Sequence, residues 1–343
     1  MERDVSTAIR ESGQAMSPGL RVAIMTDETG WHTSRLKKAF LARDVEARCV
    51  DLAQCRIDTT WAPHGLAIPG FGHALPDAVF VRGIAGGTFE QVTLRLGILH
   101  ALRECGVPVY NDARAIERSV DKSMTSFLLN LHGVPTPATW AGESAAFAQR
   151  VLMREAAANR RVVLKPLFGS QGKGLRRLGT NRRDGALTPL PSLRASGQVA
   201  YLQRYVETAR PGFDWRVLVI GGRAVAAMRR VGGKGWIHNF AQGAKCERAP
   251  LDPVLADTAE RATRALGLDY AGVDLIPSQP ASRNGADETR PLVLEVNGVA
   301  AWRGLQSVTD IDIAAALADD LLERRLAALR VEPAPLKTRD VLR

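Results

Sequence analysis

The sequence predicts an α/β protein in which an N-terminal parallel α/β domain precedes a larger region built from strands, hairpins and helices. Short apolar runs alternate with helical stretches through the first third of the chain, which is typical of a parallel sheet. Further along, Gly221-Gly222 separates two strand-like segments, as expected of a tight hairpin turn. With 343 residues, of which 45% are hydrophobic, the chain is long enough for more than one core.

The first domain is expected over residues 20–120, after a flexible extension at 1–19. Its segments are strand-like at 21–26, 45–52 and 77–81, helical at 34–42 and 89–104, and strand-like again at 107–109. Parallel sheets bind ligands at the carboxyl ends of their strands. Thr26-Asp27 and Arg82-Gly83 follow two of these strands, so they are either part of a substrate pocket or ordinary loop residues. The amphipathic stretch Val92–Leu102 either packs on this sheet or forms an interface between copies.

The remaining elements are expected in the following order. An alanine-rich helix at 141–159 precedes a buried strand, and a hairpin pairs 214–220 with 223–230. A helix at 253–267 ends at a glycine, and the last long helix covers 310–329. Residues 331–343 are expected to form a tail.

A glycine-rich loop follows the strand that ends at Lys165. The residues from Val162 read V-V-L-K-P-L-F-G-S-Q-G-K-G, with glycines at 169, 172 and 174. Glycines let the backbone approach a ligand closely, and backbone N–H groups cradle phosphate oxygens. Ser170 adds a hydroxyl donor. The lysine precedes the glycines, so the loop is neither a Walker A loop nor the dinucleotide fingerprint. By itself it would equally suit a hairpin turn.

Two strand-like runs near the C-terminus carry acidic residues where apolar ones are expected. Asp274 lies in G-V-D-L-I, and Glu295 lies in L-V-L-E-V-N. A polar link joins the two runs, so a hairpin would place Asp274 beside Glu295. Asn297 lies two residues beyond Glu295 and therefore shares its face of the strand. These oxygen ligands suit Mg²⁺ shared with phosphates, although the residues would also suit ordinary polar strand ends.

Two further segments have features of a nucleotide site. Val199–Glu207 is a strand followed by an acidic residue, and such an edge can offer backbone N–H and C=O groups to an adenine. Asp121 is a good helix N-cap, and Lys122 begins that helix where its side chain can point at an α-phosphate.

As an ordered set, these motifs resemble the ATP-grasp superfamily, and within it the RimK-like amino-acid ligases. The resemblance spans Asp121–Leu322 and comprises Asp-Lys, Lys-Pro-x-x-Gly-Ser-x-Gly-x-Gly, Gln-x-Tyr-Val, Asp-x-Arg, Val-Asp and Glu-Val-Asn. It implies an α+β ATP-grasp fold with a lid subdomain at 121–205 and a C-terminal subdomain with the magnesium site at 206–330. The two subdomains would clamp ATP behind a pre-ATP-grasp domain.

The resemblance also implies a role for each matching residue. Catalysis would involve Lys165, Arg216 and Arg230, and the magnesium ions would be held by Asp274, Glu295 and Asn297. The ATP-binding residues would be Lys122, Lys165, Gly169, Ser170, Gly172, Gly174, Gln203, Arg204, Tyr205, Val206, Asp214 and Asn239. In this assignment Asp214 lies near the ribose, and the cofactors are ATP and two Mg²⁺ ions, which Mn²⁺ can replace. The loop before Asn239 departs from the family pattern, because His238 or Ile237 replaces the usual arginine.

The implied reaction joins a carboxylate to an amine through an acyl-phosphate. RimK-like ligases add glutamate to acidic acceptors, and the region from Arg82 to Asp121 is similar to the branch that serves tetrahydromethanopterin or methanofuran. A ligase that modifies a protein C-terminus or forms another amide is an alternative. The third alternative is a non-catalytic protein that binds ATP or nucleic acid, and the full set of three magnesium ligands argues against it.

Composition restricts the partners and the compartment. The net charge is +10, from 46 basic and 36 acidic residues, which favours anionic substrates such as polyphosphates and polycarboxylates. Aromatic residues are only 6% and no nucleic-acid motif is present, which argues against nucleic acid as a partner. No apolar run is long enough for a membrane span, and the N-terminus lacks a secretory pattern. Four scattered cysteines are expected to be free thiols in the cytoplasm. The resemblance implies a homo-oligomer.

Overall fold

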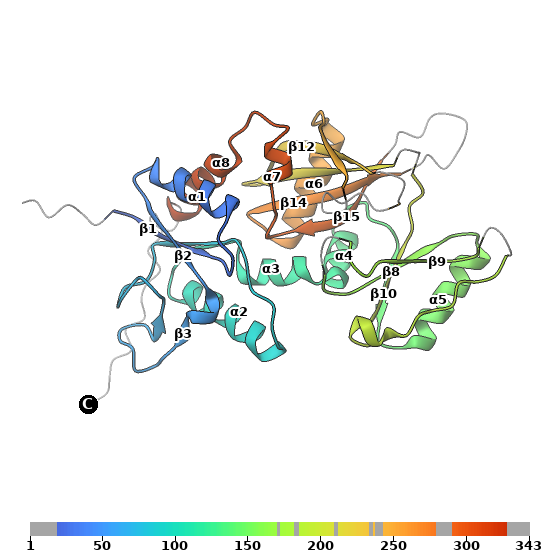
Figure 1. Ribbon diagram of the computed structural model, residues 1–343, viewed down its shortest axis with the longest axis horizontal. Coiled ribbons are helices and arrows are strands. Elements are labelled where there is room, and N and C mark those ends of the chain that lie inside the picture. The colour runs from blue at the N-terminus through green and yellow to red at the C-terminus, as the bar shows by residue number, and fades with distance from the viewer. Residues whose placement is uncertain are drawn as a thin grey trace, which may run out of the picture.

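The computed structural model describes residues 19–169, 172–181, 185–208, 212–232, 236, 243–278 and 290–327. Three β-sheets make up most of the molecule and lie at its left, its upper middle and its lower right in Figure 1. They correspond to the N-terminal domain, a large C-terminal sheet and a smaller sheet that we call the lid sheet. No helix among the described residues is long and apolar enough to cross a membrane.

The N-terminal sheet is parallel, as predicted. Its order is β2-β1-β5-β6, formed by β1 (Arg21–Met25), β2 (Glu46–Val50), β5 (Ala78–Val81) and β6 (Val109–Tyr110). Around it lie α1 (Trp31–Leu41), α2 (Phe89–Glu104), a short 3-10 turn (Leu52–Gln54) and a small pair of strands, β3 (Arg56–Ile57) and β4 (Leu66–Ala67). Ile98, Leu99 and Leu102 of α2 are fully buried in this domain's core, so this part of α2 packs on its own sheet.

The lid sheet has the order β7-β10-β8-β9. Its strands are β7 (Thr139–Gly142), β8 (Val162–Lys165), β9 (Arg176–Leu178) and β10 (Ala200–Arg204), with α5 (Ala145–Ala157) on one side and a short 3-10 turn (Leu193–Ser196) before β10. The prediction that the helix begins at residue 141 was wrong. Residues 139–142 pair with β10 instead, and Ser144 caps the helix by accepting from the N–H of Phe147.

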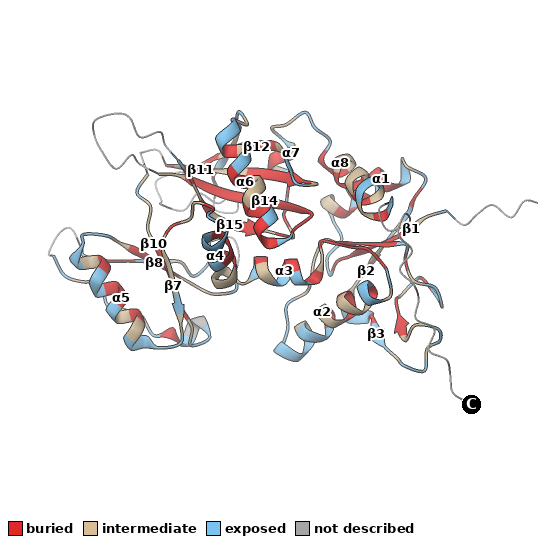
Figure 2. Cartoon of the chain, turned by 180° about the vertical axis from the view of Figure 1, so that it is seen from behind, coloured by how far each residue is buried: buried red, intermediate tan, exposed pale blue. Residues whose placement is uncertain are grey.

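The large sheet is antiparallel and has the order β13-β12-β11-β14-β15. It is formed by β11 (Phe213–Ile220), β12 (Arg223–Val231), β13 (Lys245–Arg248), β14 (Tyr270–Pro277) and β15 (Pro291–Asn297). The predicted hairpin is confirmed, because Gly221 and Gly222 both have positive φ and join β11 to β12. The sheet strands are mostly buried (Figure 2).

The two faces of the large sheet have different partners. One face packs on α6 (Pro253–Leu266), which ends at a left-handed Gly267 as predicted, and on apolar residues of α4 (Lys122–Leu131). On the other face, Tyr270 and its neighbours pack against the N-terminal domain and the C-terminal helices. The helices not yet given are α3 (Ala113–Val120), α7 (Arg303–Gln306) and α8 (Ile313–Asp319), which continues as a π-helical turn over Asp320–Leu326.

A buried asparagine joins the N-terminal domain to the large sheet. Asn111, directly after β6, has no exposed surface. Its side-chain amide donates to the carbonyls of Tyr270 (2.8 Å) and Gly298 (2.7 Å). Its side-chain carbonyl accepts from the N–H groups of Asp269 (2.5 Å) and Tyr270 (3.1 Å). All four bonds are made to the start of β14 and the end of β15, so this residue fixes the position of the two domains.

We expect Asn111→Ala to destabilise the protein by about 3–5 kcal/mol, because it leaves several buried backbone groups without a partner. Denaturant unfolding followed by circular dichroism would measure the loss. Asn130→Ala, at an exposed position of α4, is the control and should cost less than about 0.5 kcal/mol. Equal effects of the two substitutions would contradict the docking role of Asn111.

Candidate active site

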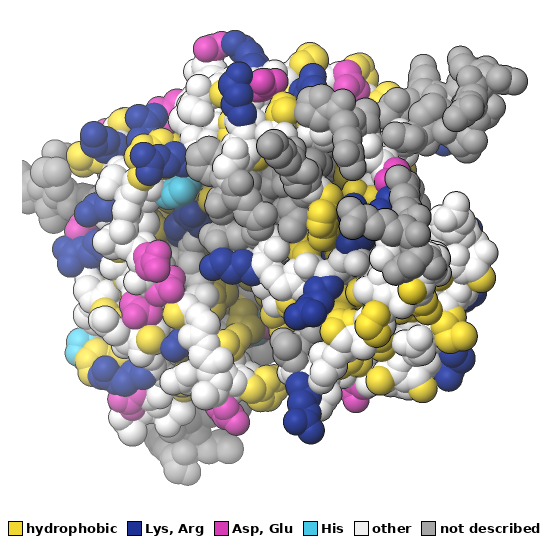
Figure 3. Space-filling view, turned by 45° about the vertical axis from the view of Figure 1, so that its right-hand side comes forward, with side chains coloured by type: hydrophobic (Ala, Val, Ile, Leu, Met, Phe, Trp, Pro, Cys, Tyr) yellow, Lys and Arg dark blue, Asp and Glu magenta, His cyan; other side chains and the backbone are white. Residues whose placement is uncertain are grey.

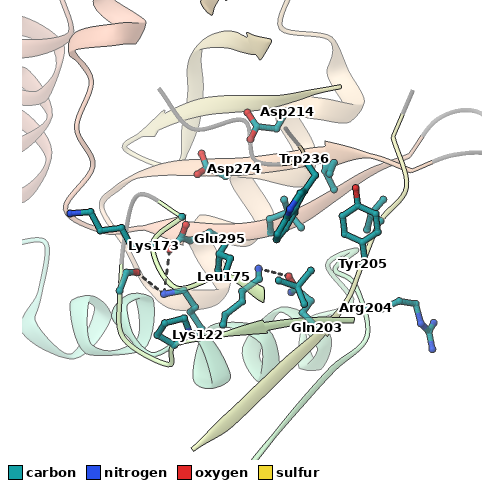
Figure 4. Close-up of a pocket in the computed structure, with 18 of the residues that line it drawn as sticks. Lys122, Lys173, Leu175, Gln203, Arg204, Tyr205, Asp214, Trp236, Asp274 and Glu295 are labelled. Atoms are coloured by element: carbon teal, nitrogen blue, oxygen red, sulfur yellow. Dashed lines mark hydrogen bonds and ion pairs between the residues drawn. The ribbon is translucent and has the colours of Figure 1, made fainter. Parts of the chain in front are cut away.

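A cleft lies between the lid sheet and the large sheet, and residues from both sheets line it (Figure 4). Several of the residues named from the sequence lie around this one cavity. They are Lys122, Lys165, Gly169, Gly172, Gln203, Arg204, Tyr205, Val206, Asp214, Arg230, Asp274 and Glu295.

Lys165 ends β8 inside the cleft. The antiparallel register places it opposite Tyr201 on β10, and its ammonium donates to the side-chain carbonyl of Gln203 at 2.6 Å. Gln203 is itself buried and its amide donates to Thr139 and Tyr201. Burial and the nearby charge of Lys122 lower the pKa of Lys165 to about 8, although Glu295 opposes the shift. An anion that binds beside this buried ammonium group would stabilise its protonated form.

Lys122 connects the glycine-rich loop to the large sheet. As the first residue of α4, it follows Asp121, whose carboxylate accepts from the N–H groups of Ser123 and Met124. Its ammonium donates to the carbonyl of Gly169 at 2.7 Å and lies 3.7 Å from the carboxylate of Glu295. One side chain thus contacts the start of the loop and one proposed magnesium ligand, in a position to reach phosphates between them.

The loop between β8 and β9 has the backbone that its glycines predict. Gly169, Gly172 and Gly174 all have positive φ, where other residues are strained. A Cβ at Gly174 would lie 2.9 Å from the ring of Pro166, so the loop folds closely over the end of β8. Gly169 and Gly172 line the cleft, whereas Gly174 is not among its lining residues.

Arg204, the last residue of β10, is among the residues that line the cleft. Its side chain points away from the cavity and pairs with Glu155, with Nε 2.8 Å from a carboxylate oxygen (Figure 4). Glu155 also pairs with Arg160. If Arg204 contacts an adenine, it therefore does so through its main chain. Tyr205 and Trp236 lie edge to face, with ring centroids 5.8 Å apart, at the same end of the cleft.

The two carboxylates proposed as magnesium ligands lie at opposite positions on two neighbouring strands. Asp274 on β14 lies directly opposite Glu295 on β15, as the hairpin prediction required. Asn297 shares the face of Glu295, and its amide nitrogen donates to the carbonyl of Gly272 at 3.1 Å. That bond leaves the amide oxygen as a possible ligand. Two carboxylates and one amide oxygen are hard ligands that fit Mg²⁺.

Two arginines neutralise the acids on this face. Arg216 donates to both oxygens of Asp274 (2.7 and 2.8 Å), and Arg230 donates to both oxygens of Asp214 (2.7 and 2.9 Å) while lying 3.1 Å from Asp274. Burial alone would raise the pKa of Asp274, but Arg216 and Arg230 outweigh it and lower that pKa. Asp214 therefore pairs with Arg230, and Arg216 pairs with Asp274.

Not every residue named from the sequence lies in the cleft. Arg216 and Asn297 are not among its lining residues, although both lie on the face that carries Asp274. Ser170 and Asn239, together with most of the loop before Asn239, lie outside the described residues.

Seven lining residues were not assigned to the site from the sequence. Lys173 lies within the glycine-rich motif itself, so its charge was an available signal. Apolar side chains make up the other six, which are Val163, Pro166, Leu175, Trp236, Ile276 and Leu294. The guanidinium of Arg177 lies 5.5 Å from the Trp236 ring and 5.1 Å from the Tyr205 ring, a contact between segments distant in sequence.

Comparison with protein families agrees with this geometry. Residues 119–321 match the RimK-like ATP-grasp domain, and residues 20–116 match the RimK PreATP-grasp domain. The chain belongs to the RimK-like ATP-grasp family. It is therefore an ATP-grasp ligase, and the resemblance inferred from the ordered motifs is confirmed.

Curated relatives carry more specific names. The chain is 33% identical over 247 residues to tetrahydromethanopterin:alpha-L-glutamate ligase of Methanosarcina acetivorans, covering 67% of this chain and 74% of that protein. It is 30% identical over 308 residues to the protein of the same name from Methanococcus maripaludis, covering 88% of this chain and 98% of that protein.

A solved structure with the same fold is the ATP-grasp ligase PsnB complexed with a minimal precursor, Mg and ADP. The TM-score is 0.63 at 22% identity, covering 88% of this chain and 96% of that one. The likeness establishes the fold.

The low pKa of Lys165 predicts a pH dependence of ATP binding. Phosphates favour the protonated lysine, so affinity should be constant below pH 8 and fall by up to about tenfold per pH unit above it. Titration calorimetry between pH 6.5 and 9.5 would measure this. Lys165→Met should bind ATP more weakly at pH 7 and lack the step near pH 8, whereas the same step in both proteins would contradict the assignment.

Proposed function

We propose that the protein adds L-glutamate to an acidic small-molecule acceptor of the one-carbon carrier type, such as a tetrahydromethanopterin or methanofuran cofactor. ATP is converted to ADP and phosphate. The chemistry follows from membership of the ligase family, and the two substrates are proposed from the relatives named as glutamate ligases.

The observation that carries the proposal is the meeting of opposite charges in one cleft. Lys122 and Lys165 enter from the helix and lid-sheet side, while Asp274 and Glu295 face them from the large sheet. Lysines stabilise transferring phosphates, and paired carboxylates hold the metal that accompanies ATP. A module that only binds a nucleotide does not need both sets.

The reaction would proceed in two steps. A carboxylate oxygen of the acceptor attacks the γ-phosphorus of ATP, ADP leaves, and an acyl-phosphate forms. The amine of glutamate then attacks the acyl carbon, inorganic phosphate leaves, and an amide remains. Both steps develop negative charge on oxygen, which nearby cations stabilise. No covalent bond to the protein is needed.

The chain's own residues supply binding and charge. In this proposal, Lys165 and Lys122 hold the phosphates, and Arg230 lies beside the acids of the large sheet to stabilise the transferring phosphoryl group. Mg²⁺ held by Asp274 and Glu295, with Asn297 as a further donor, would add positive charge at the phosphates. Trp236 and Leu175 line the cleft with apolar surface, which would limit the access of water to the acyl-phosphate.

The charge of the chain supports an acidic acceptor. The net charge is +10, and Lys and Arg side chains surround a hollow with apolar side chains on the face turned forward in Figure 3. Such a surface attracts anions before they bind.

The direct test supplies ATP, Mg²⁺ and L-glutamate with a panel of acceptors that includes reduced pterins, furan cofactors and peptides ending in glutamate. Coupled ADP release and mass spectrometry identify any product. A cofactor heavier by one glutamyl unit is expected. Glutamylation of the peptides alone would replace the proposed acceptor with a protein tail, and ADP without any amide would show that the amine is wrong.

Glu295→Gln should lower amide formation by about 100-fold or more, because it removes a charge opposite Asp274 while keeping the side-chain shape. The reaction above measures the loss, and circular dichroism checks the fold. Glu143→Gln, an exposed position of the lid, should keep full activity. Unimpaired turnover in Glu295→Gln would refute the assignment of Glu295 as a magnesium ligand.

A further inference from the structure

Arg82 is a partly buried cation without an ion-pair partner in the described part of the chain. It follows β5, and its backbone N–H donates to the carbonyl of Met25 on β1 at 2.8 Å. Its guanidinium lies over the ring of Trp302, 5.3 Å from the centroid. Its Nε is buried without a hydrogen-bond partner, and no carboxylate of the described chain forms an ion pair with it. Leaving such a group unpaired is costly, which points to a missing anion.

The surroundings of Arg82 add positive potential. His32 accepts from the backbone N–H of Trp302 at 3.1 Å, and its pKa falls to about 4 through burial and through the charges of Arg82 and Arg303. Burial likewise lowers the pKa of Arg82. The charge of Asp27 opposes this lowering of the pKa, but Asp27 forms no ion pair with the guanidinium. An entering carboxylate would therefore meet two arginines and a neutral histidine.

The place of Arg82 in the fold connects it to the reaction site. The hydroxyl of Tyr270 donates to the carbonyl of Val81, next to Arg82. Tyr270, Gly272 and Asp274 alternate along β14 and therefore share one face. At the strand rise of about 3.3 Å per residue, Tyr270 and Asp274 are about 13 Å apart. One end of this face meets the N-terminal domain, and the other end meets the cleft.

Between these two ends, the backbone of β14 at Gly272 lies close to Ala300. A Cβ at Gly272 would lie 3.0 Å from the Cβ of Ala300 and 3.7 Å from the Nε of Arg216. Residues 298–302 thus run from the magnesium ligands of β15 toward Trp302, on which Arg82 is stacked. Arg82-Gly83 and Thr26-Asp27 also lie at the carboxyl ends of parallel strands, where α/β sheets bind ligands.

We propose that Arg82 binds a carboxylate of an acid substrate, distinct from the carboxylate that ATP activates. The proposal rests on the proposed function and names a specificity determinant of the same site. The planar guanidinium suits a carboxylate and holds it while the other end of the substrate reaches the phosphates. The carboxylate belongs either to the acceptor or to the incoming amino acid, and in both cases the site selects a molecule with two acidic groups over one with a single acid.

Steady-state kinetics of Arg82→Met test the proposal and identify the source of the carboxylate. The KM of one acid substrate should rise by about tenfold to a hundredfold, as expected for a lost charged hydrogen bond, with the KM of ATP unchanged. A rise in the KM of the acceptor assigns the carboxylate to the acceptor, and a rise in the KM of L-glutamate assigns it to the amino acid. Arg82→Lys should fall between wild type and Arg82→Met.

Arg229→Met is the matched control. Arg229 also stacks on an aromatic ring, 4.1 Å from the centroid of Phe213, and its Nε is also buried without a partner. Because it neighbours Arg230 along β12, its side chain points to the opposite face of the sheet. It should leave both acid KM values unchanged, and an equal change in both variants would show a structural effect instead of binding.

A binding experiment separates this proposal from the ligase activity itself. Calorimetry with a non-hydrolysable ATP analogue present would compare glutarate, L-glutamate and butyrate. Wild type should bind at least one of the diacids more tightly than butyrate, and Arg82→Met should lose that preference. Arg82-dependent diacid binding without product from any acceptor would refute the proposed function alone. Unchanged KM values and affinities in Arg82→Met, or no diacid binding by wild type, would refute the role of Arg82.

Discussion

The geometry of the whole site depends on the alternation of residues along β14. This strand pairs with β11 on one side and β15 on the other, so both neighbours are fixed in register against it. Every second side chain of β14 then lies on the same face of the sheet. Tyr270 and Asp274 share this face, and Tyr270 contacts the N-terminal domain while Asp274 lies in the cleft. The hydrogen bonds of Asn111 fix the end of this strand. A shift of one residue would turn Asp274 into the apolar core beneath α6.

Buried charge is the second constraint, and it explains which side chains are free to act. The acids of the large sheet are matched by Arg216 and Arg230, and Glu155 in the lid is matched by Arg204 and Arg160. Burying an ion is tolerable only when such partners are present. Lys165 has a neutral partner, Gln203, and Arg82 has no ion-pair partner among the described residues. These two cations are therefore the ones best placed for substrate anions.

Sequence reasoning recovered the features that local pattern controls. The parallel N-terminal sheet, the Gly-Gly hairpin, the glycine stop of α6 and the pairing of Asp274 with Glu295 all follow from alternation and turn chemistry. It did not predict which side chains pair with each other. The side chain of Arg204 turns away from the cleft to reach Glu155, and Arg230 binds Asp214 across the β11–β12 hairpin.

By itself, the sequence determined the order of the domains, the glycine-rich loop and the family, because these depend on the spacing of motifs along the chain. Only the tertiary structure decided which charges are paired and which are left without a partner. Pairing depends on how the strands and helices pack, as for Arg216 and Asp274, which are 58 residues apart and meet only because β11 pairs with β14. The contact of Arg82 with Trp302 is of the same kind, since it needs the two domains to be docked before either residue acquires its surroundings.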